Sequence, residues 1–200
     1  QEALDTVERN YGSGFFLFIG VLRYYKGLHF LVKAAAASGL PVVIAGDGPR
    51  KRSLMDYARD LGADNVHFPG FVSDDTKQAL FAKARAIVFP SCERSEAFGV
   101  TLLEGQMHEL PLITCDIGTG TSYVNQHGET GLIIPPADID ALASAMRELK
   151  EAPDYARIMG KAGRVRLGAM FAGDQTAAQY FSLYEQLYES ETGGRLTKKG

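Results

Sequence analysis

Residues 86–104 read AIVFPSCERSEAFGVTLLE. The first four residues form a short apolar run, as in strands that are buried on both faces of a parallel sheet. A polar loop follows, and an amphipathic helix is expected to begin near Gly99. A buried strand, a loop and a helix in this order form the first half of a βαβ unit, so an α/β fold is expected.

The same alternation of short apolar runs and amphipathic segments extends over most of the chain. The candidate strands are Phe15–Ile19, Pro41–Ala45, Val66–Phe68, Ala86–Phe89, Leu110–Thr114 and Gly131–Ile134. The candidate helices are Gly27–Ala37, Arg50–Leu61, Asp75–Ala84, Gly99–Glu109, Ile139–Lys150, Asp154–Leu167 and Asp174–Tyr188. Because βαβ crossovers are almost always right-handed, this pattern predicts a Rossmann-like, doubly wound parallel sheet of about six strands with helices on both faces.

Composition and charge restrict the classes of function. The 200 residues are 46% hydrophobic and 22% charged, which is typical of a globular domain. The net charge of −3 provides no basic field for a nucleic-acid backbone, so no nucleic acid is expected as a partner. The two cysteines, Cys92 and Cys115, are too few for a disulfide framework and indicate a reducing, cytoplasmic environment. No apolar run approaches the roughly 18 to 20 residues that span a bilayer.

The two ends of the chain are polar, which suggests where the folded domain lies. The chain begins without methionine in a polar stretch, residues 1–14, which we expect to be a linker from a missing N-terminal domain. Residues 15–189 form the predicted Rossmann-like domain, and residues 190–200 form a polar tail. We therefore expect the chain to be a piece of a longer protein.

Two glutamates flank the expected start of the helix near Gly99. Ligands of doubly wound sheets bind at the carboxyl ends of the strands, and Glu96 and Glu104 both follow such an end. Eight helical residues would separate the two by about 12 Å, whereas the acid and base of a glycoside hydrolase lie about 5 to 9.5 Å apart. The spacing instead suits the two ends of one extended ligand. The alternative is a solvated loop glutamate and an ordinary surface glutamate.

A second glycine-rich loop, residues 20–27, follows the first strand. Lys26 lies at the start of the next helix, where the helix dipole disfavours a cation, so its charge suggests a bound anion such as a diphosphate. Arg23 is a further candidate, and a flexible surface side chain is the alternative for both. By contrast, the turn Gly46-Asp47-Gly48-Pro49 is weak evidence for a dinucleotide site, because the third glycine is absent. The four histidines show no metal-ligand spacing, so no metal is expected.

Glu96 through Glu104 resembles the Glu-x7-Glu signature of retaining glycosyltransferases with the GT-B fold, the group 1 enzymes of glycosyltransferase family 4. The resemblance runs from Phe15 to Tyr188 and covers the C-terminal, donor-binding domain only. It implies that Glu96, the catalytic-site glutamate, contacts hydroxyls of the donor sugar and that Glu104 binds the ribose. It also implies that four backbone amides line the sugar and the diphosphate, those of Phe98, Gly99, Val100 and Thr101.

The resemblance also covers the loop after the first strand. The family pattern there is Gly-Arg-Leu, three variable residues and Lys-Gly, which places Gly20 and Lys26 at the donor. Val21 stands where the family has arginine, and we expect Arg23 to share the diphosphate with Lys26 in its place. Further along, Val72 and Lys77 match family positions near the nucleotide base.

The resemblance is nearest to O-antigen and lipopolysaccharide mannosyltransferases, which favours GDP-mannose over another nucleoside diphosphate sugar. It implies transfer, without cofactor or metal, to a glycan or lipid-linked acceptor by a cytoplasmic enzyme that works at the inner face of the plasma membrane. Alone, the chain is expected to bind the donor weakly and to turn over nothing. Two alternatives remain open, a non-catalytic sugar-nucleotide-binding or regulatory module and an NAD-dependent Rossmann enzyme.

Overall fold

The computed structural model describes residues 1–171 and 173–192 of the chain. The chain divides into two compact units, Gln1–Arg164 and Val165–Gly200. The first unit holds the sheet and every residue that the sequence analysis assigned to the site. The second unit begins within α8 (Pro153–Met170) and includes α9 (Gly173–Thr192).

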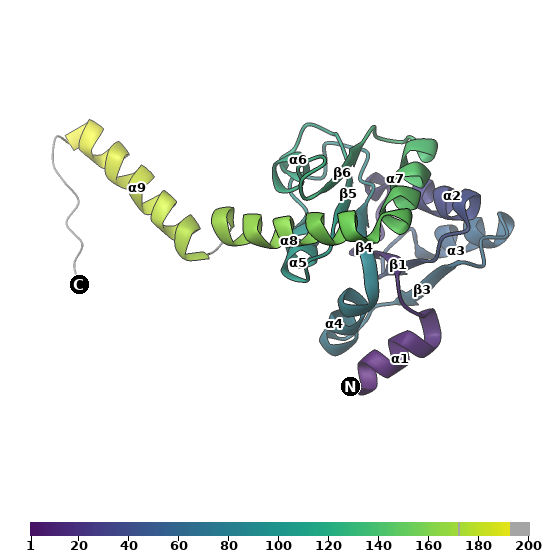
Figure 1. Ribbon diagram of the computed structural model, residues 1–200. Helices are drawn as coiled ribbons and strands as arrows, with labels where there is room; N and C mark the ends of the chain where they lie inside the picture. The colour runs from purple at the N-terminus through teal and green to yellow at the C-terminus, as the bar shows by residue number, and fades with distance from the viewer. Residues whose placement is uncertain (172, 193–200) are drawn as a thin grey trace. The chain divides into compact units, whose positions relative to one another are not determined.

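The first unit is built on six parallel strands in the order β3-β2-β1-β4-β5-β6 (Figure 1). Their bounds are β1 (Phe15–Ile19), β2 (Val42–Ala45), β3 (Val66–Gly70), β4 (Ala84–Phe89), β5 (Leu112–Cys115) and β6 (Gly131–Ile134). Four consecutive residues of β1, Phe15 to Phe18, are fully buried, as expected for a central strand that is covered on both faces. The predicted doubly wound α/β fold is confirmed.

Helices connect successive strands and cover both faces of the sheet (Figure 1). Their bounds are α1 (Glu2–Tyr11), α2 (Leu28–Ser38), α3 (Lys51–Asp60), α4 (Asp74–Lys83), α5 (Val100–Met107), α6 (Gly120–Val124), α7 (Ile139–Glu151) and α8 (Pro153–Met170), with a 3₁₀ turn η1 (Tyr24–Lys26) before α2. Right-handed crossovers place α2 and α3 on one face and α4, α5 and α6 on the other. Helix α7 packs against α2 and so shares its face, whereas α1 packs against α4.

The N-terminal stretch differs from the prediction. Residues 1–14 were expected to be a linker, but α1 occupies most of them and packs on α4. Val7 of α1 is buried, and Glu8 of the same helix forms an ion pair of 2.6 Å with Lys83 at the end of α4. At the other end, residues 190–192 of the predicted tail form the last turn of α9, and residues 193–200 lie outside the described part of the chain.

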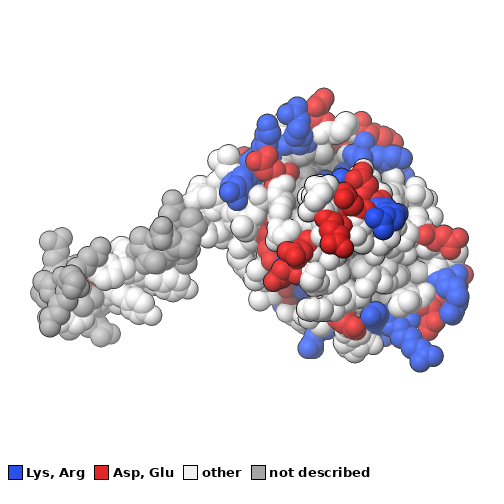
Figure 2. All heavy atoms as spheres, turned by 90° about the horizontal axis from the view of Figure 1, so that it is seen from below, with Lys and Arg blue, Asp and Glu red and all other residues white. Residues whose placement is uncertain are grey.

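Charge on the surface is mixed in sign. The face that carries α1 and α4 shows acidic and basic side chains interspersed, with no broad basic area (Figure 2). Within residues 1–171 and 173–192, no helix combines the length and the apolar character that crossing a bilayer would require.

Candidate functional site

The candidate site lies where two neighbouring strands end. Strands β1 and β4 are adjacent at the point where the strand order reverses, and such switch points open a crevice at the carboxyl edge of the sheet. The loops that follow these two strands touch through their backbones. The Cys92 amide donates to the Tyr25 carbonyl at 3.0 Å, and a β-carbon on Gly27 would lie only 2.1 Å from the Pro90 carbonyl oxygen. The sequence therefore needs glycine at position 27 for the loops to meet.

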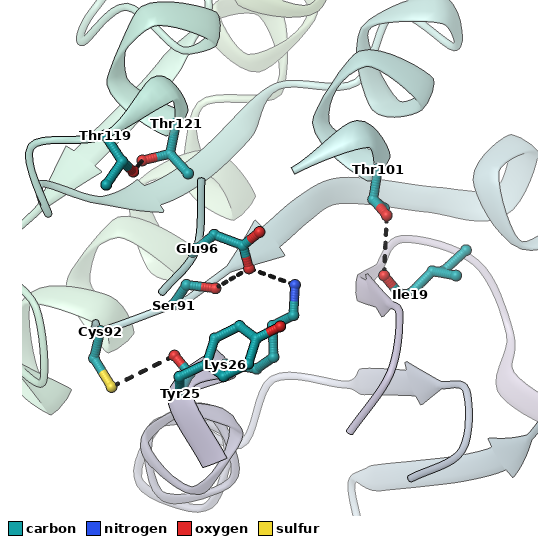
Figure 3. A network of polar contacts seen from close by, with 9 residues as sticks. All are labelled: Ile19, Tyr25, Lys26, Ser91, Cys92, Glu96, Thr101, Thr119 and Thr121. Atoms are coloured by element: carbon teal, nitrogen blue, oxygen red, sulfur yellow. Dashed lines mark hydrogen bonds and ion pairs between the residues drawn. The ribbon is translucent and has the colours of Figure 1, made fainter. Parts of the chain in front are cut away.

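A buried ion pair bridges the two loops. The Lys26 ammonium donates to Oε2 of Glu96, and the Ser91 hydroxyl donates to the same oxygen at 3.1 Å (Figure 3). Only 11% of the Lys26 side chain and 9% of the Glu96 side chain are exposed. Because a buried charge is costly without a partner, the pair and the serine together account for the presence of a carboxylate here.

Aromatic rings enclose the Lys26 ammonium. Its nitrogen lies 4.5 Å from the ring centre of Phe89, the last residue of β4, and 5.3 Å from that of Tyr25. These are cation–π distances, which stabilise a cation that has few water molecules around it. The end of β4 and the η1 turn thus fix the position of a positive charge at the switch point.

Helix α5 begins beside this pair. Gly99 is its N-cap with φ 85° and ψ 77°, and a β-carbon there would lie 2.9 Å from the Phe89 ring, so another residue would strain the turn. The Thr101 hydroxyl donates to the Ile19 carbonyl at 3.1 Å and ties the helix start to the end of β1 (Figure 3). The amides of Val100 and Thr101 have no acceptor within the helix, which makes this terminus suitable for an anion.

A cavity of about 380 Å³ adjoins the site at the ends of β1, β2 and β3. Its walls are mostly apolar, with two aspartates and one lysine, and its size is in the range of small-molecule sites. Nine residues line it: Ile19, Gly20, Val21, Gly46, Asp47, Phe71, Val72, Asp74 and Lys77. A larger cavity of about 760 Å³ lies between α1 and α4 and contains none of the predicted site residues.

A second ion pair joins the cavity to α5. The Lys77 ammonium, on α4, donates to Oε1 of Glu104 on α5. The two side chains are 24% and 30% exposed, so this pair is more open to ligand and water than the Lys26–Glu96 pair. Each of the two predicted glutamates is therefore held by one of the two predicted lysines.

The sequence profile of the family described as "Glycosyl transferases group 1" matches residues 2–166. The chain belongs to this family. The match includes the residues of α1.

Two relatives of this group 1 domain are similar over most of its length. It is 48% identical to O-antigen chain mannosyltransferase C of Escherichia coli over 181 residues, which are 90% of the chain and 49% of the relative. It is 49% identical to D-rhamnosyltransferase WbpZ of Pseudomonas aeruginosa over 170 residues, which are 85% of the chain and 45% of that relative. The chain spans about half the length of these relatives.

Solved structures share its fold. Sucrose-phosphate synthase from Thermosynechococcus elongatus matches with a TM-score of 0.82 at 27% identity, over 94% of the chain and 49% of that protein. Anabaena Alr3699/HepE, solved in complex with UDP and glucose, matches with a TM-score of 0.78 at 18% identity, over 90% of the chain and 52% of that protein. The latter likeness concerns the fold alone.

The structure gathers most of the predicted residues of the group 1 domain at one edge of the sheet. Glu96 meets Lys26, Glu104 meets Lys77, and Gly20 and Val72 line the adjoining cavity. The helix that supplies the predicted amides begins where it was expected; of these residues, Val100 is exposed and Phe98, Gly99 and Thr101 are half-buried. Their roles toward a donor stay predictions.

Arg23 lies differently from the other candidates. Its side chain is exposed at the start of η1, whereas the Lys26 ammonium is buried, and the contact between the two residues is a backbone hydrogen bond of 3.2 Å. Val21, at the family's arginine position, is 52% exposed and lines the cavity. A shared grip of Arg23 and Lys26 on a diphosphate stays a prediction.

Sequence reasoning missed Ser91 and the cavity residue Phe71, and it interpreted Asp74 or Asp75 as a candidate cap of the next helix, whereas Ser73 is the N-cap of α4 and Asp74 lines the cavity. Ser91 is 1% exposed and contacts Glu96 directly, but a lone serine after a strand has no pattern that marks it. Phe71 is 85% exposed, and a large apolar side chain in a loop after a strand was a usable signal for a ligand surface.

The two cysteine thiols are not activated, and no metal site forms among the described residues. Burial raises the pKa of the Cys115 thiol to about 12, and burial also raises that of Cys92. Neither thiol is therefore a nucleophile near neutral pH. Among the described residues, no three His, Cys, Asp or Glu side chains come together as a metal site.

Proposed function

We propose that this chain is the donor-binding domain of a retaining glycosyltransferase, which moves a sugar from a nucleoside diphosphate to a hydroxyl of a glycan or lipid-linked acceptor. The observation that carries the proposal is the Lys26–Glu96 pair at the switch point of the sheet, beside the start of α5. A cation, free amides and a carboxylate in one place suit a diphosphate joined to a sugar, which offers negative charge at one end and hydroxyl donors at the other.

The charges of this site fit the departure of a nucleoside diphosphate. As the bond to the sugar breaks, negative charge grows on the diphosphate oxygens, and fixed cations and amides lower the energy of that state. Lys26 and the amides at the start of α5 supply these groups without a bound metal or cofactor. Glu96 accepts hydrogen bonds from the sugar hydroxyls and so orients the sugar.

The nucleoside extends from there into the cavity beside Val72 and Lys77. Oε1 of Glu104 is taken by Lys77, which leaves its second oxygen for the ribose hydroxyls. Phe71 and Val72 offer the base an apolar wall. In this pose the two glutamates contact the two ends of one extended donor.

The carboxylates at the cavity favour guanine as the base. The pairing edge of guanine carries adjacent N–H donors, which a carboxylate accepts, whereas that of uracil has one N–H flanked by two oxygen acceptors. Asp47 forms an ion pair with Lys51, which leaves Asp74 as the carboxylate to meet the base. We therefore favour GDP-mannose, the donor class that suits a relative named as a mannosyltransferase.

The remaining half of such an enzyme would hold the acceptor. We place the whole enzyme in the cytoplasm, with a lipid-linked acceptor at the inner face of the plasma membrane and no nucleic acid as a partner. The isolated chain is expected to bind the donor weakly and to transfer nothing. A non-catalytic sugar-nucleotide-binding module is the second candidate, and the observation that favours it is Val21 at the family's arginine position.

Calorimetric titration of the chain with GDP, UDP, GDP-mannose, UDP-glucose and NAD tests the proposal. We expect GDP-mannose to bind more tightly than GDP, GDP more tightly than UDP, and NAD not at all. Glu104→Gln should weaken GDP about tenfold, since it loses a charged acceptor for the ribose. Glu93→Gln, an exposed glutamate in the loop before Glu96, is the control and should change nothing. Binding of NAD in preference to both nucleoside diphosphates would overturn the proposal.

A further inference from the structure

We propose that Ser91 is a positioning residue for donor-sugar recognition, because its hydroxyl sets the orientation of the Glu96 carboxylate. This inference rests on the proposed contact between Glu96 and the sugar. Ser91 itself is 1% exposed, so it cannot touch the donor and acts through Glu96.

The two donors to Glu96 converge on one oxygen. Ser91 Oγ lies 3.1 Å from Oε2, and the Lys26 ammonium meets the same Oε2. The second carboxylate oxygen points away from both donors (Figure 3). Oε2 is thus hydrogen-bonded within the protein, and Oε1 is left to accept a hydrogen bond from a ligand hydroxyl.

The two donors differ in how well they define a direction. An ammonium has three rotatable donors and acts as a point charge, so Lys26 alone would hold the carboxylate through either oxygen. Ser91 is the second residue after β4, next to Pro90, and its hydroxyl reaches the carboxylate from the start of the loop. The serine therefore adds the directional hydrogen bond that fixes the orientation of the carboxylate.

The hydrogen bond from Ser91 to Glu96 becomes more important when a diphosphate is bound. In the proposed function Lys26 also contacts the diphosphate, so the phosphate oxygens compete with Glu96 for the ammonium. Ser91 is then the donor that keeps the carboxylate in place during sugar binding. The main chain of Glu96 is held separately, by a hydrogen bond of 3.1 Å from its amide to the Glu93 carbonyl, so loss of the serine hydroxyl affects the side chain first.

The experiment compares each nucleotide sugar with its own nucleoside diphosphate, GDP-mannose with GDP and UDP-glucose with UDP, by calorimetry on the 200-residue chain. The variants are Ser91→Ala, Ser91→Thr and Glu96→Gln, and Ser95→Ala is the control, an exposed serine in the same loop. Thermal unfolding of each variant is measured in parallel. Ser91→Ala should weaken the nucleotide sugar about three- to tenfold, the range of one ordinary hydrogen bond, and leave the nucleoside diphosphate within about twofold.

Ser91→Thr, which keeps the hydroxyl, should restore the affinity for the sugar, and Ser95→Ala should change neither ligand. An equal loss for sugar and nucleoside diphosphate in Ser91→Ala would indicate a structural role only and overturn the inference. So would an unchanged sugar affinity in Ser91→Ala, or a failure of Ser91→Thr to restore it with an unchanged unfolding midpoint. If Glu96→Gln leaves the preference for the sugar unchanged, or if neither pair of ligands binds, the proposed function itself fails.

Discussion

Lys26 and Glu96 place opposite charges where water has little access, so each depends on the other. Removing one partner of a buried pair leaves an uncompensated charge and costs about 3–5 kcal/mol. We expect Lys26→Met, which keeps the length of the side chain, to lower the free energy of unfolding by about 3 kcal/mol. Adding Glu96→Gln to Lys26→Met should recover more than half of this loss, because the unpaired charge is then gone. Urea unfolding of the single and double variants measures both values.

The ion pair between Lys83 and Glu8 provides the matched control for this prediction. It joins α4 to α1 with 25% and 54% of the side chains exposed, and exposed pairs contribute about 1 kcal/mol or less. Lys83→Met should therefore cost far less than Lys26→Met. Equal losses at the two lysines would contradict the view that burial makes the Lys26–Glu96 pair costly to break.

Single residues of the site were predictable where they occupy a marked position in the strand–loop–helix pattern. Glu96 and Glu104 flank a helix start after a buried strand, and Lys26 lies just before an earlier helix start, after the first strand. Their contacts were not predictable, because Lys26 and Glu96 are 70 positions apart and meet only through the order of the strands. Ser91 had no signal, since its role depends on a side chain five positions away whose direction the sequence does not fix.

At the scale of elements, the loop after β1 meets the loop after β4 only because residue 27 has no side chain. Gly27 and Gly39 lie at the two ends of α2 with nearly the same left-handed backbone, φ 65° and 68°. A β-carbon on Gly39 would meet nothing within 4 Å, whereas one on Gly27 would collide with Pro90. A comparison of substitutions at the two glycines therefore separates the cost of backbone strain from the cost of disturbing the contact between the loops.

We expect Gly39→Ala to lower stability by about 1–2 kcal/mol, the cost of a left-handed alanine. Gly27→Ala should cost a further 1–3 kcal/mol, because the two loops must move apart. It should also weaken nucleotide-sugar binding, which Gly39→Ala should leave unchanged. Urea unfolding and calorimetry of the two variants provide the measurements, and equal effects at both glycines would contradict the role given to the loop contact.

Elements with strong patterns were predicted closely, and the others were missed for physical reasons. Strands β1 and β6 have the predicted bounds, because apolar runs that are buried on both faces end sharply. Helix α1 was missed because its one buried residue, Val7, sits among polar residues, and only packing on α4 distinguishes it from a linker. Helix α6 spans five residues of a Gly/Thr/Ser-rich stretch, which has no periodicity to detect.

At the scale of the whole first unit, the sheet determines which loops become neighbours. The sequence predicted a doubly wound sheet, and the observed order places β1 beside β4, so the two loops with the most informative residues share one edge. The cavity beside β2 and β3 continues that edge. The order of the strands thus brings residues that are dispersed over positions 19–104 of the sequence together into one site.

The first unit should become less stable as the pH falls through the range in which histidines titrate. Burial, with Arg50 as a smaller cause, lowers the pKa of His29. Burial also lowers the pKa of His108; Glu104 opposes this with a smaller effect, and Arg164 adds a still smaller lowering. Both rings stack on an aromatic neighbour, with ring centres 5.5 Å apart for His29 and Tyr24 and 4.7 Å apart for His108 and Phe81.

The sign of the effect follows from which state binds more protons. Below the ordinary histidine pKa of 6.5 the unfolded chain takes up protons that the folded chain does not, so stability is complete above that pH and decreases below it. Urea unfolding between about pH 7.5 and 5.5, above the range where carboxylates titrate, should show this decrease. The double variant His29→Gln/His108→Gln should flatten the profile, because glutamine does not titrate. An equally steep profile in the double variant would assign the pH dependence to other groups.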